Sequence, residues 1–94
     1  MENGLERYYG GDENWLRYVE AVSVNWSAYG QKTELLDALN GQEDIAKVCV
    51  EKFPYNIFKV ITEQTNSLGG LCISQCCSDE KLIKRVRTML MRMP

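Results

Sequence analysis

The sequence predicts an all-α domain, a compact bundle of about five short helices. Apolar residues recur at helical spacing along most of the chain, and Gly and Pro residues divide this pattern into short segments. The last segment carries an apolar arc opposite a basic arc. With 94 residues, the chain has room for one small globular domain, residues 1–94. An α+β fold with strands near residues 22–28 and 71–76 is the alternative.

The first helix is predicted to follow Gly10–Gly11, with Asp12 as its N-cap, and to stop at Gly30. Its apolar residues share one face, at spacings of four, three, four and three residues: Trp15, Val19, Val22, Trp26 and Tyr29. Residues 22–28 also alternate between apolar and polar, which is typical of a strand. We favour a helix because the apolar face extends back through good helix formers.

Two short helices are predicted in the middle of the chain. The first has three leucines on one face and ends near Asn40–Gly41: Leu35, Leu36 and Leu39. Asn40 and Glu43 have the spacing of a capping box, which indicates the start of the second. Its apolar face is formed by Ile45, Cys49 and Phe53.

Pro54 predicts a boundary between two helices. Pro lacks an N–H to donate within a helix, so the preceding helix stops or kinks there. Pro is favoured in the first turn of a new helix, which we expect over residues 54–65. That helix has four apolar residues: Ile57, Phe58, Val60 and Ile61. It ends before Gly69–Gly70.

The C-terminal part contains one ambiguous segment and one strongly amphipathic helix. Residues 71–77 are compatible with a strand, a helical turn or coil, and Ser78 or Asp79 is expected to cap the final helix. An apolar arc is expected to face the core: Leu82, Ile83, Val86, Met89, Leu90 and Met93. The basic arc lies opposite, with Met91 among its charges: Lys81, Lys84, Arg85, Arg87 and Arg92.

Charge is distributed unevenly along the chain. Residues 1–44 hold nine acidic and three basic residues, a formal charge of −6, whereas residues 45–94 hold eight basic and four acidic residues, a formal charge of +4. The basic helix has the pattern that binds nucleic acid, an anionic membrane or an acidic protein groove. It is equally suited to pair with the acidic half of the same fold or of a second copy.

The residue types argue against catalysis and against a metal site. The chain has no His. Its serines therefore have no imidazole as a general base, and the commonest zinc ligand is missing from the sequence. The carboxylates are scattered, and Gly69–Gly70 lies in no phosphate-binding motif. Cys72, Cys76 and Cys77 would need Cys49 as a fourth ligand. We therefore expect no catalytic residues, no cofactor and no metal.

The compartment is predicted from the N-terminus and from the cysteines. The first residues are polar and acidic, unlike a secretory signal. The apolar runs are far shorter than the roughly 20 residues that span a bilayer. We expect a cytoplasmic protein without a membrane span, in a reducing compartment that keeps its four cysteines as free thiols.

Two short segments resemble known families. Residues 35–46, LLDALNGQEDIA, resemble the penultimate and last helices of death-fold interaction domains. Residues 44–47, DIAK, resemble the start of a helix-turn-helix, with apolar positions of the second helix at Ile57, Val60 and Ile61. The first resemblance implies binding to another protein. The second implies DNA binding through residues 54–65, which contain Lys59 as their single basic residue.

We expect a non-enzymatic protein-protein interaction module, a small helical adaptor, inhibitor or regulator. Its partner would be an acidic protein surface or a second copy in a homodimer. The alternative is a DNA-binding regulator that uses residues 44–65 and the basic C-terminal helix. Nine residues are the candidates for partner binding: Tyr8, Tyr9, Tyr18, Lys81, Lys84, Arg85, Arg87, Met91 and Arg92.

Overall fold

The computed structural model describes residues 9–92, except for the side chain of Ser67. Helices dominate these residues: α1 (Asp12–Val22), the 3-10 helix η2 (Ser23–Ala28), α2 (Lys32–Ala38), α3 (Glu43–Lys52), α4 (Ile57–Thr62), the 3-10 helix η3 (Asn66–Leu68), α5 (Ile73–Cys76) and α6 (Glu80–Arg92). The predicted all-α class is confirmed. The extended pairing within this range is a single bridge between Thr65 and Leu71.

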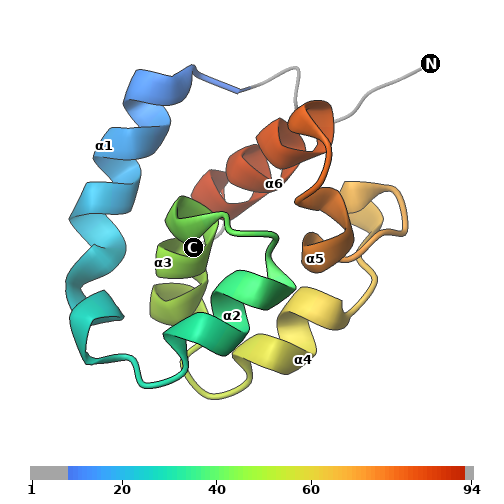
Figure 1. Cartoon of the computed structure of the whole chain (residues 1–94). Helices are drawn as coiled ribbons and strands as arrows, with labels where there is room; N and C mark the ends of the chain where they lie inside the picture. The colour runs from blue at the N-terminus through green and yellow to red at the C-terminus, as the bar shows by residue number, and fades with distance from the viewer. Residues whose placement is uncertain (1–8, 93–94) are drawn as a thin grey trace.

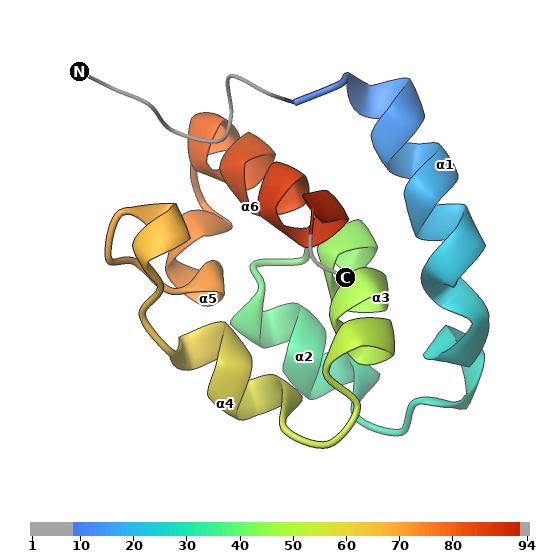
Figure 2. The same ribbon diagram turned by 180° about the vertical axis from the view of Figure 1, so that it is seen from behind.

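The helices pack around α3 (Figure 1). Helix α3 contacts α1, η2 and α2, while α6 contacts α1, α5 and η3. Seen from behind, α6 crosses the molecule beside α3, with α1 running along the outer edge (Figure 2). Fully buried side chains from seven elements form the shared core, the largest being Trp15, Leu35, Leu39, Ile45, Ile61, Leu68, Ile73 and Leu90. Burial of these side chains is the main favourable term in folding.

The two segments that could have been strands are helical. Residues 22–28 continue α1 as η2, and half-buried Trp26 packs against the core. Residues 71–76 contain the single turn α5, which Cys72 precedes as N-cap residue. The α+β alternative was therefore wrong, because a strand is stable only beside other strands. The turn at α5 also brings the helix count above the predicted five.

Two predicted caps are corrected by the structure. Gly11, at φ 101°, is the N-cap residue of α1, and Asp12 is the first helical residue. The positive φ explains the glycine. Asn40 closes α2 in the left-handed conformation, at φ 56°, and its amide nitrogen donates to the carbonyl of Cys77 at 3.2 Å. The predicted Asn40–Glu43 capping box is absent, because α3 begins at Glu43 with Gln42 as its N-cap residue, which leaves Asn40 outside the start of the helix. The predicted cap at Asp79 is confirmed, because its carboxylate accepts hydrogen bonds from the amides of Lys81 and Leu82.

The break at Pro54 is confirmed, but the next helix begins later than predicted. Residues 54–56 form an exposed turn, and α4 starts at Ile57. The reason lies in the core, where Ile57 and Ile61 are buried. The helix starts where its first side chain enters the core, although Pro54 alone would permit an earlier start.

The predicted apolar face of α6 is confirmed. One residue of the predicted basic face, Arg87, is largely buried. Val86 and Leu90 are buried, and their apolar neighbours on the helix are half-buried. The predicted Met93 lies outside the described residues. The side chain of Arg87 is only 18% exposed, although the helical wheel places it in the basic arc. It is covered because α6 packs on two sides, against the core and against α1.

Candidate interaction groove between α1 and α6

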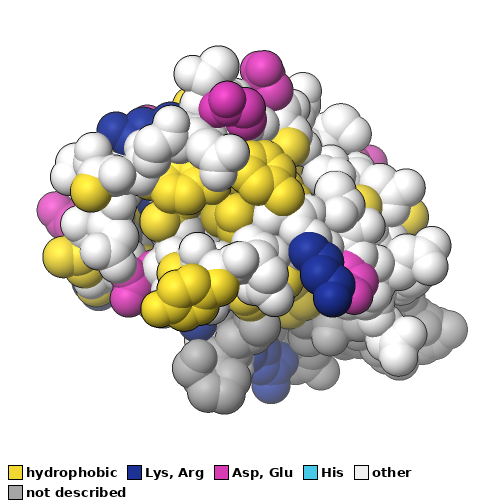
Figure 3. Space-filling view, turned by 90° about the horizontal axis from the view of Figure 1, so that it is seen from below, with side chains coloured by type: hydrophobic (Ala, Val, Ile, Leu, Met, Phe, Trp, Pro, Cys, Tyr) yellow, Lys and Arg dark blue, Asp and Glu magenta, His cyan; other side chains and the backbone are white. Residues whose placement is uncertain are grey.

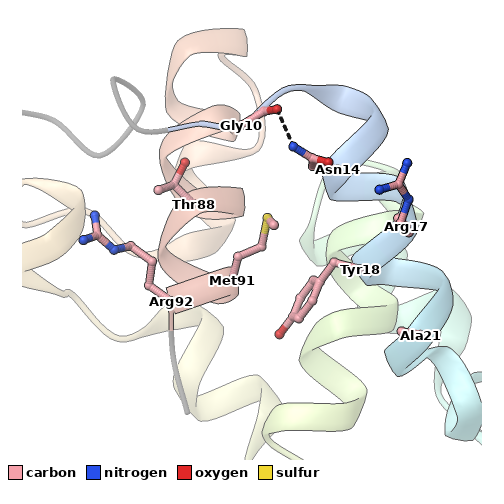
Figure 4. Close-up of a pocket in the computed structure, with 8 residues that line it drawn as sticks. All are labelled: Gly10, Asn14, Arg17, Tyr18, Ala21, Thr88, Met91 and Arg92. Atoms are coloured by element: carbon pink, nitrogen blue, oxygen red, sulfur yellow. Dashed lines mark hydrogen bonds between the residues drawn. The ribbon is translucent and has the colours of Figure 1, made fainter.

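A groove of about 710 Å³ opens between α1 and α6. Tyr18 and Ala21 line it from α1, and Thr88 and Met91 line it from α6 (Figure 4). Gly10, Asn14, Arg17 and Arg92 complete the lining. The side chains of Tyr18 and Met91 both project into the space between α1 and α6. The groove therefore offers an aromatic ring and a flexible thioether, both suited to binding apolar side chains.

Tyr18 is held in place before any partner binds. Its hydroxyl donates to the backbone carbonyl of Leu90 at 3.3 Å, which ties α1 to α6. The ring centroid lies 6.0 Å from that of Trp15, and Lys52 Nζ lies 5.7 Å from the ring. A ring fixed on two sides loses little conformational freedom on binding, which favours affinity.

Positive charge flanks the apolar part of the groove. Arg17 projects from α1 on one side, and Arg92 is exposed at the end of α6 on the other (Figure 4). Arg17 makes a 3.4 Å ion pair with Glu13, and both side chains are largely exposed to solvent. Exposed pairs of this kind contribute little to stability, so a stronger acidic partner can displace Glu13.

A polar network centred on Arg87 lies next to the groove. One guanidinium nitrogen donates to Asp44 at 2.9 Å, and another donates to the Tyr9 hydroxyl at 2.8 Å and to Asp12 at 3.2 Å. Trp15 Nε1 donates to the same Asp44 carboxylate at 2.6 Å. The network thus joins α1, α3 and α6. Arg87 pairs the basic C-terminal half of the chain with the acidic N-terminal half inside one fold.

Two pKa shifts accompany this network. The hydrogen bond from Tyr9 is the main cause that lowers the pKa of Asp12, and Arg87 adds to it. Partial burial is the main cause that raises the pKa of Tyr9, followed by its hydrogen bond to Asp12. Both shifts favour an ionised Asp12 and a neutral Tyr9, which is the arrangement that the hydrogen bonds require.

The structure separates the nine sequence-predicted binding residues into groups. Tyr18, Met91 and Arg92 meet in the groove. Tyr9 and Arg87 belong to the polar network, so they hold the fold together and are less available to a partner. Three others lie along α6, where Lys84 borders a separate polar recess: Lys81, Lys84 and Arg85. Tyr8 lies outside the described residues.

Apart from Tyr18, sequence reasoning missed the residues that α1 supplies to the groove. The candidates did not include Asn14, Arg17 and Ala21, although all three residues line the groove. Together with Tyr18 they recur at spacings of three and four, which marks a second stripe on the helix. The signal was present, but the stripe is polar enough to resemble an ordinary solvated face.

The helix-turn-helix candidate has a short second helix. Helix α4 has six residues, two of which are buried in the core. Lys59 is its single basic residue, and it is exposed. A recognition helix needs several side chains that reach bases or phosphates, and α4 offers few.

The four cysteines are buried free thiols. Burial raises the pKa of Cys49 and of Cys77 to about 12, and neighbouring thiols add to both shifts. Burial opposes ionisation of Cys72 too, but hydrogen bonds led by that with Ser74 outweigh it and lower its pKa. Within residues 9–92, no group of three or more potential ligands is arranged to hold a metal ion.

These pKa shifts predict the order of alkylation, since the thiolate is the nucleophile. At neutral pH, iodoacetamide should modify Cys72 first and should leave Cys49 and Cys77 unmodified until the protein unfolds. Mass spectrometry of peptides after timed quenching measures this order. Equal labelling of all four cysteines in the native protein would contradict the burial of Cys49 and Cys77. Labelling in urea is the control, because it measures the intrinsic reactivity of each thiol in the unfolded chain.

Comparison with known proteins adds no further information, since no family model, characterised protein or solved structure matches the chain. None of the helices in the described part of the chain has the length and apolar character needed to cross a membrane. The fold and the groove define an all-α domain with a preformed apolar groove flanked by arginines.

Proposed function

We propose that this chain is a non-enzymatic, cytoplasmic protein-interaction module whose α1–α6 groove accepts a short amphipathic helix of a partner protein. The observation that carries the proposal is the groove itself. It brings Tyr18 and Met91, which lie 73 positions apart in the sequence, to facing walls of one apolar hollow. Helix-in-groove binding uses such a hollow to take up apolar side chains from successive turns.

The dimensions support a helical occupant. From Asn14 to Ala21 the lining covers two turns of α1, which corresponds to about 10 Å along the helix axis. Two turns of a partner helix present two or three apolar residues at i, i+4 and i+7, enough to cover the floor of the groove.

The flanking charges indicate the character of the partner. Arg17 and Arg92 border the apolar floor, and α6 carries further cations along its length. An apolar stripe flanked by Glu or Asp complements this arrangement, whereas a stripe flanked by Lys is repelled. Binding should therefore weaken as salt screens the flanking charges.

The test is a titration of isotope-labelled protein with two designed helical peptides, one with leucines flanked by Glu and the other with the same leucines flanked by Lys. We expect the Glu peptide to shift the amide signals around Tyr18 and Met91 in an NMR spectrum, and to bind at least about tenfold more tightly than the Lys peptide. A Glu peptide that shifts no groove signals contradicts the proposal.

A pair of matched variants makes the test specific to the groove. Ala21→Glu adds a like charge and bulk to the groove, so it should weaken the Glu peptide at least about tenfold. Leu16→Glu adds the same residue to the same helix at a position that is 57% exposed and outside the groove, so binding should persist. Equal affinity in both variants contradicts the proposal. Shifts centred on α4 when duplex DNA is added instead would favour the DNA-binding alternative.

A further inference from the structure

Two thiols lie one helical turn apart at the short helix α5, which packs against α4 and α6 (Figure 1). The amide of Cys76 donates to the carbonyl of Cys72 at 3.3 Å, which is the hydrogen bond that closes a helical turn. The geometry of one such turn places the two Cα atoms about 6 Å apart. Disulfides form at Cα separations of about 4.4–6.8 Å, so the backbone spacing of this pair suits a bridge.

The other pairings of thiols within this segment have the wrong spacing. Adjacent Cys76 and Cys77 have Cα atoms about 3.8 Å apart, which is below the range in which disulfides form. Cys77 follows Cys72 by five positions, which in a helix separates the Cα atoms by roughly 8–9 Å, beyond the roughly 7 Å that a disulfide can span. The Cys77 thiol is also engaged, because it donates to the carbonyl of Ile73 at 3.3 Å. A disulfide at α5 can therefore join Cys72 to Cys76.

The surroundings of the two thiols give them different roles. Cys72 is 6% exposed, whereas Cys76 is fully buried. The sulfur of Cys72 accepts a hydrogen bond from the amide of Gln75 and lies 3.5 Å from the Ser74 hydroxyl. Although burial opposes ionisation, these hydrogen bonds outweigh it and lower the pKa of Cys72. Burial raises the pKa of Cys76, and the neighbouring Cys72 raises it further, so Cys72 is the better nucleophile.

We propose that Cys72 and Cys76 form a reversible redox pair that reacts with hydroperoxides. The Cys72 thiolate attacks one oxygen of the hydroperoxide: an S–O bond forms, the O–O bond breaks, and the alkoxide or hydroxide that leaves takes up the proton lost by Cys72. Cys72 has then been oxidised by two electrons to a sulfenic acid, and the hydroperoxide has been reduced to an alcohol or to water. The sulfur of Cys76 next attacks that of Cys72: an S–S bond forms, the S–O bond breaks, and hydroxide leaves as water with the proton of Cys76.

The disulfide changes the conformation of α5. Side chains four residues apart on a helix have Cβ atoms about 5–6 Å apart, whereas a disulfide needs about 3.5–4.5 Å. The turn must therefore tighten by roughly 1–2 Å, and the Cys72 sulfur leaves the capping box that starts the helix. Strained disulfides are readily reduced, so thiols such as glutathione restore the original turn.

Other targets of a peroxide on the described part of the chain give a different product. The face that carries residues 29–31 and 53–56 shows apolar side chains gathered around a hollow, and none of the residues that line this hollow contains sulfur (Figure 3). Met89 and Met91 are half-buried on α6, and a methionine gains one oxygen atom when it is oxidised. The thiol pair instead loses two hydrogen atoms, so the mass of the protein distinguishes the two reactions.

The test treats the reduced full chain with an equimolar amount of hydrogen peroxide and follows the reaction by mass spectrometry of the intact protein and by NMR. We expect the mass to fall by two hydrogen atoms and to recover when dithiothreitol is added. The Cβ signals of Cys72 and Cys76 should move to the range of disulfides, while those of Cys49 and Cys77 stay in the range of thiols. These measurements use the wild type, so they do not depend on the folding of any variant.

Three single variants assign the role of each thiol. Cys72→Ala should lower the rate of disulfide formation at least about tenfold, because the reactive thiolate is missing. Cys76→Ala should stop at the sulfenic acid of Cys72, which dimedone traps. Cys77→Ala is the matched control and should still form the bridge. The proposal is overturned by a disulfide that persists in Cys76→Ala, by a disulfide between two copies, or by a wild type whose four thiols all stay reduced.

Discussion

Trp15→Ala is expected to lower the free energy of unfolding by about 3–5 kcal/mol. The ring is fully buried between α1 and the rest of the core, and its removal leaves a cavity that the surrounding helices cannot close. The substitution also removes the Nε1–H donor that lies 2.6 Å from the Asp44 carboxylate. Because Asp44 is itself mostly shielded from water, it would keep a charge with one partner fewer.

Urea unfolding followed by circular dichroism at 222 nm measures this loss without relying on Trp fluorescence. Trp15→Phe restores most of the volume but not the donor, so we expect about 1–3 kcal/mol for that variant. Trp26→Ala is the matched control, because Trp26 is only half-buried on η2. A smaller effect for Trp15→Ala than for Trp26→Ala would contradict the central position of Trp15.

Arg87→Met is expected to lower the free energy of unfolding by about 2–4 kcal/mol. Met preserves much of the side-chain volume but removes the donors to Asp44, Asp12 and the Tyr9 hydroxyl. The guanidinium also lies 5.5 Å from the ring centroid of Trp15, a cation–π contact that is lost as well. The effect is large because Asp44 is mostly buried and would lose the cation that pairs with its carboxylate.

Thermal and urea unfolding measure the effect, and Lys84→Met is the matched control on the same helix. Lys84 is exposed, so its change should stay within about 0.5 kcal/mol. A double-mutant cycle of Arg87→Met with Asp44→Asn should give a coupling energy of about 0.5–3 kcal/mol. Equal losses for Arg87→Met and Lys84→Met would show that Arg87 is merely a solvated cation.

The position of Arg87 also affects how binding experiments are designed. The sequence placed this residue among the cations for partner binding, whereas the structure uses it to join α1, α3 and α6. A charge reversal at Arg87 would destabilise the fold, so a loss of binding in that variant would not report on the binding surface. Ala21→Glu is a better probe, because this side chain is exposed and takes no part in the polar network.

Helix positions were predictable wherever local chemistry decided them. The leucines of α2 and the boundary at Pro54 follow from spacing and from backbone geometry. The cap at Asp79 was also predictable, because its carboxylate binds amides two and three residues later in the chain. The caps proposed at Asp12 and Asn40 were wrong because neither residue occupies the N-cap position: Asp12 is the first residue of α1, and Gln42 precedes α3.

The sequence by itself determined the helical class, the main breaks between helices and the absence of a histidine-based site, since these depend on residue type and short-range spacing. Only the tertiary structure decided that Arg87 binds Asp44 and that Tyr18 and Met91 line one groove. These two pairs join positions 43 and 73 residues apart. Local periodicity reports which face of a helix is apolar, but not which other helix will cover it.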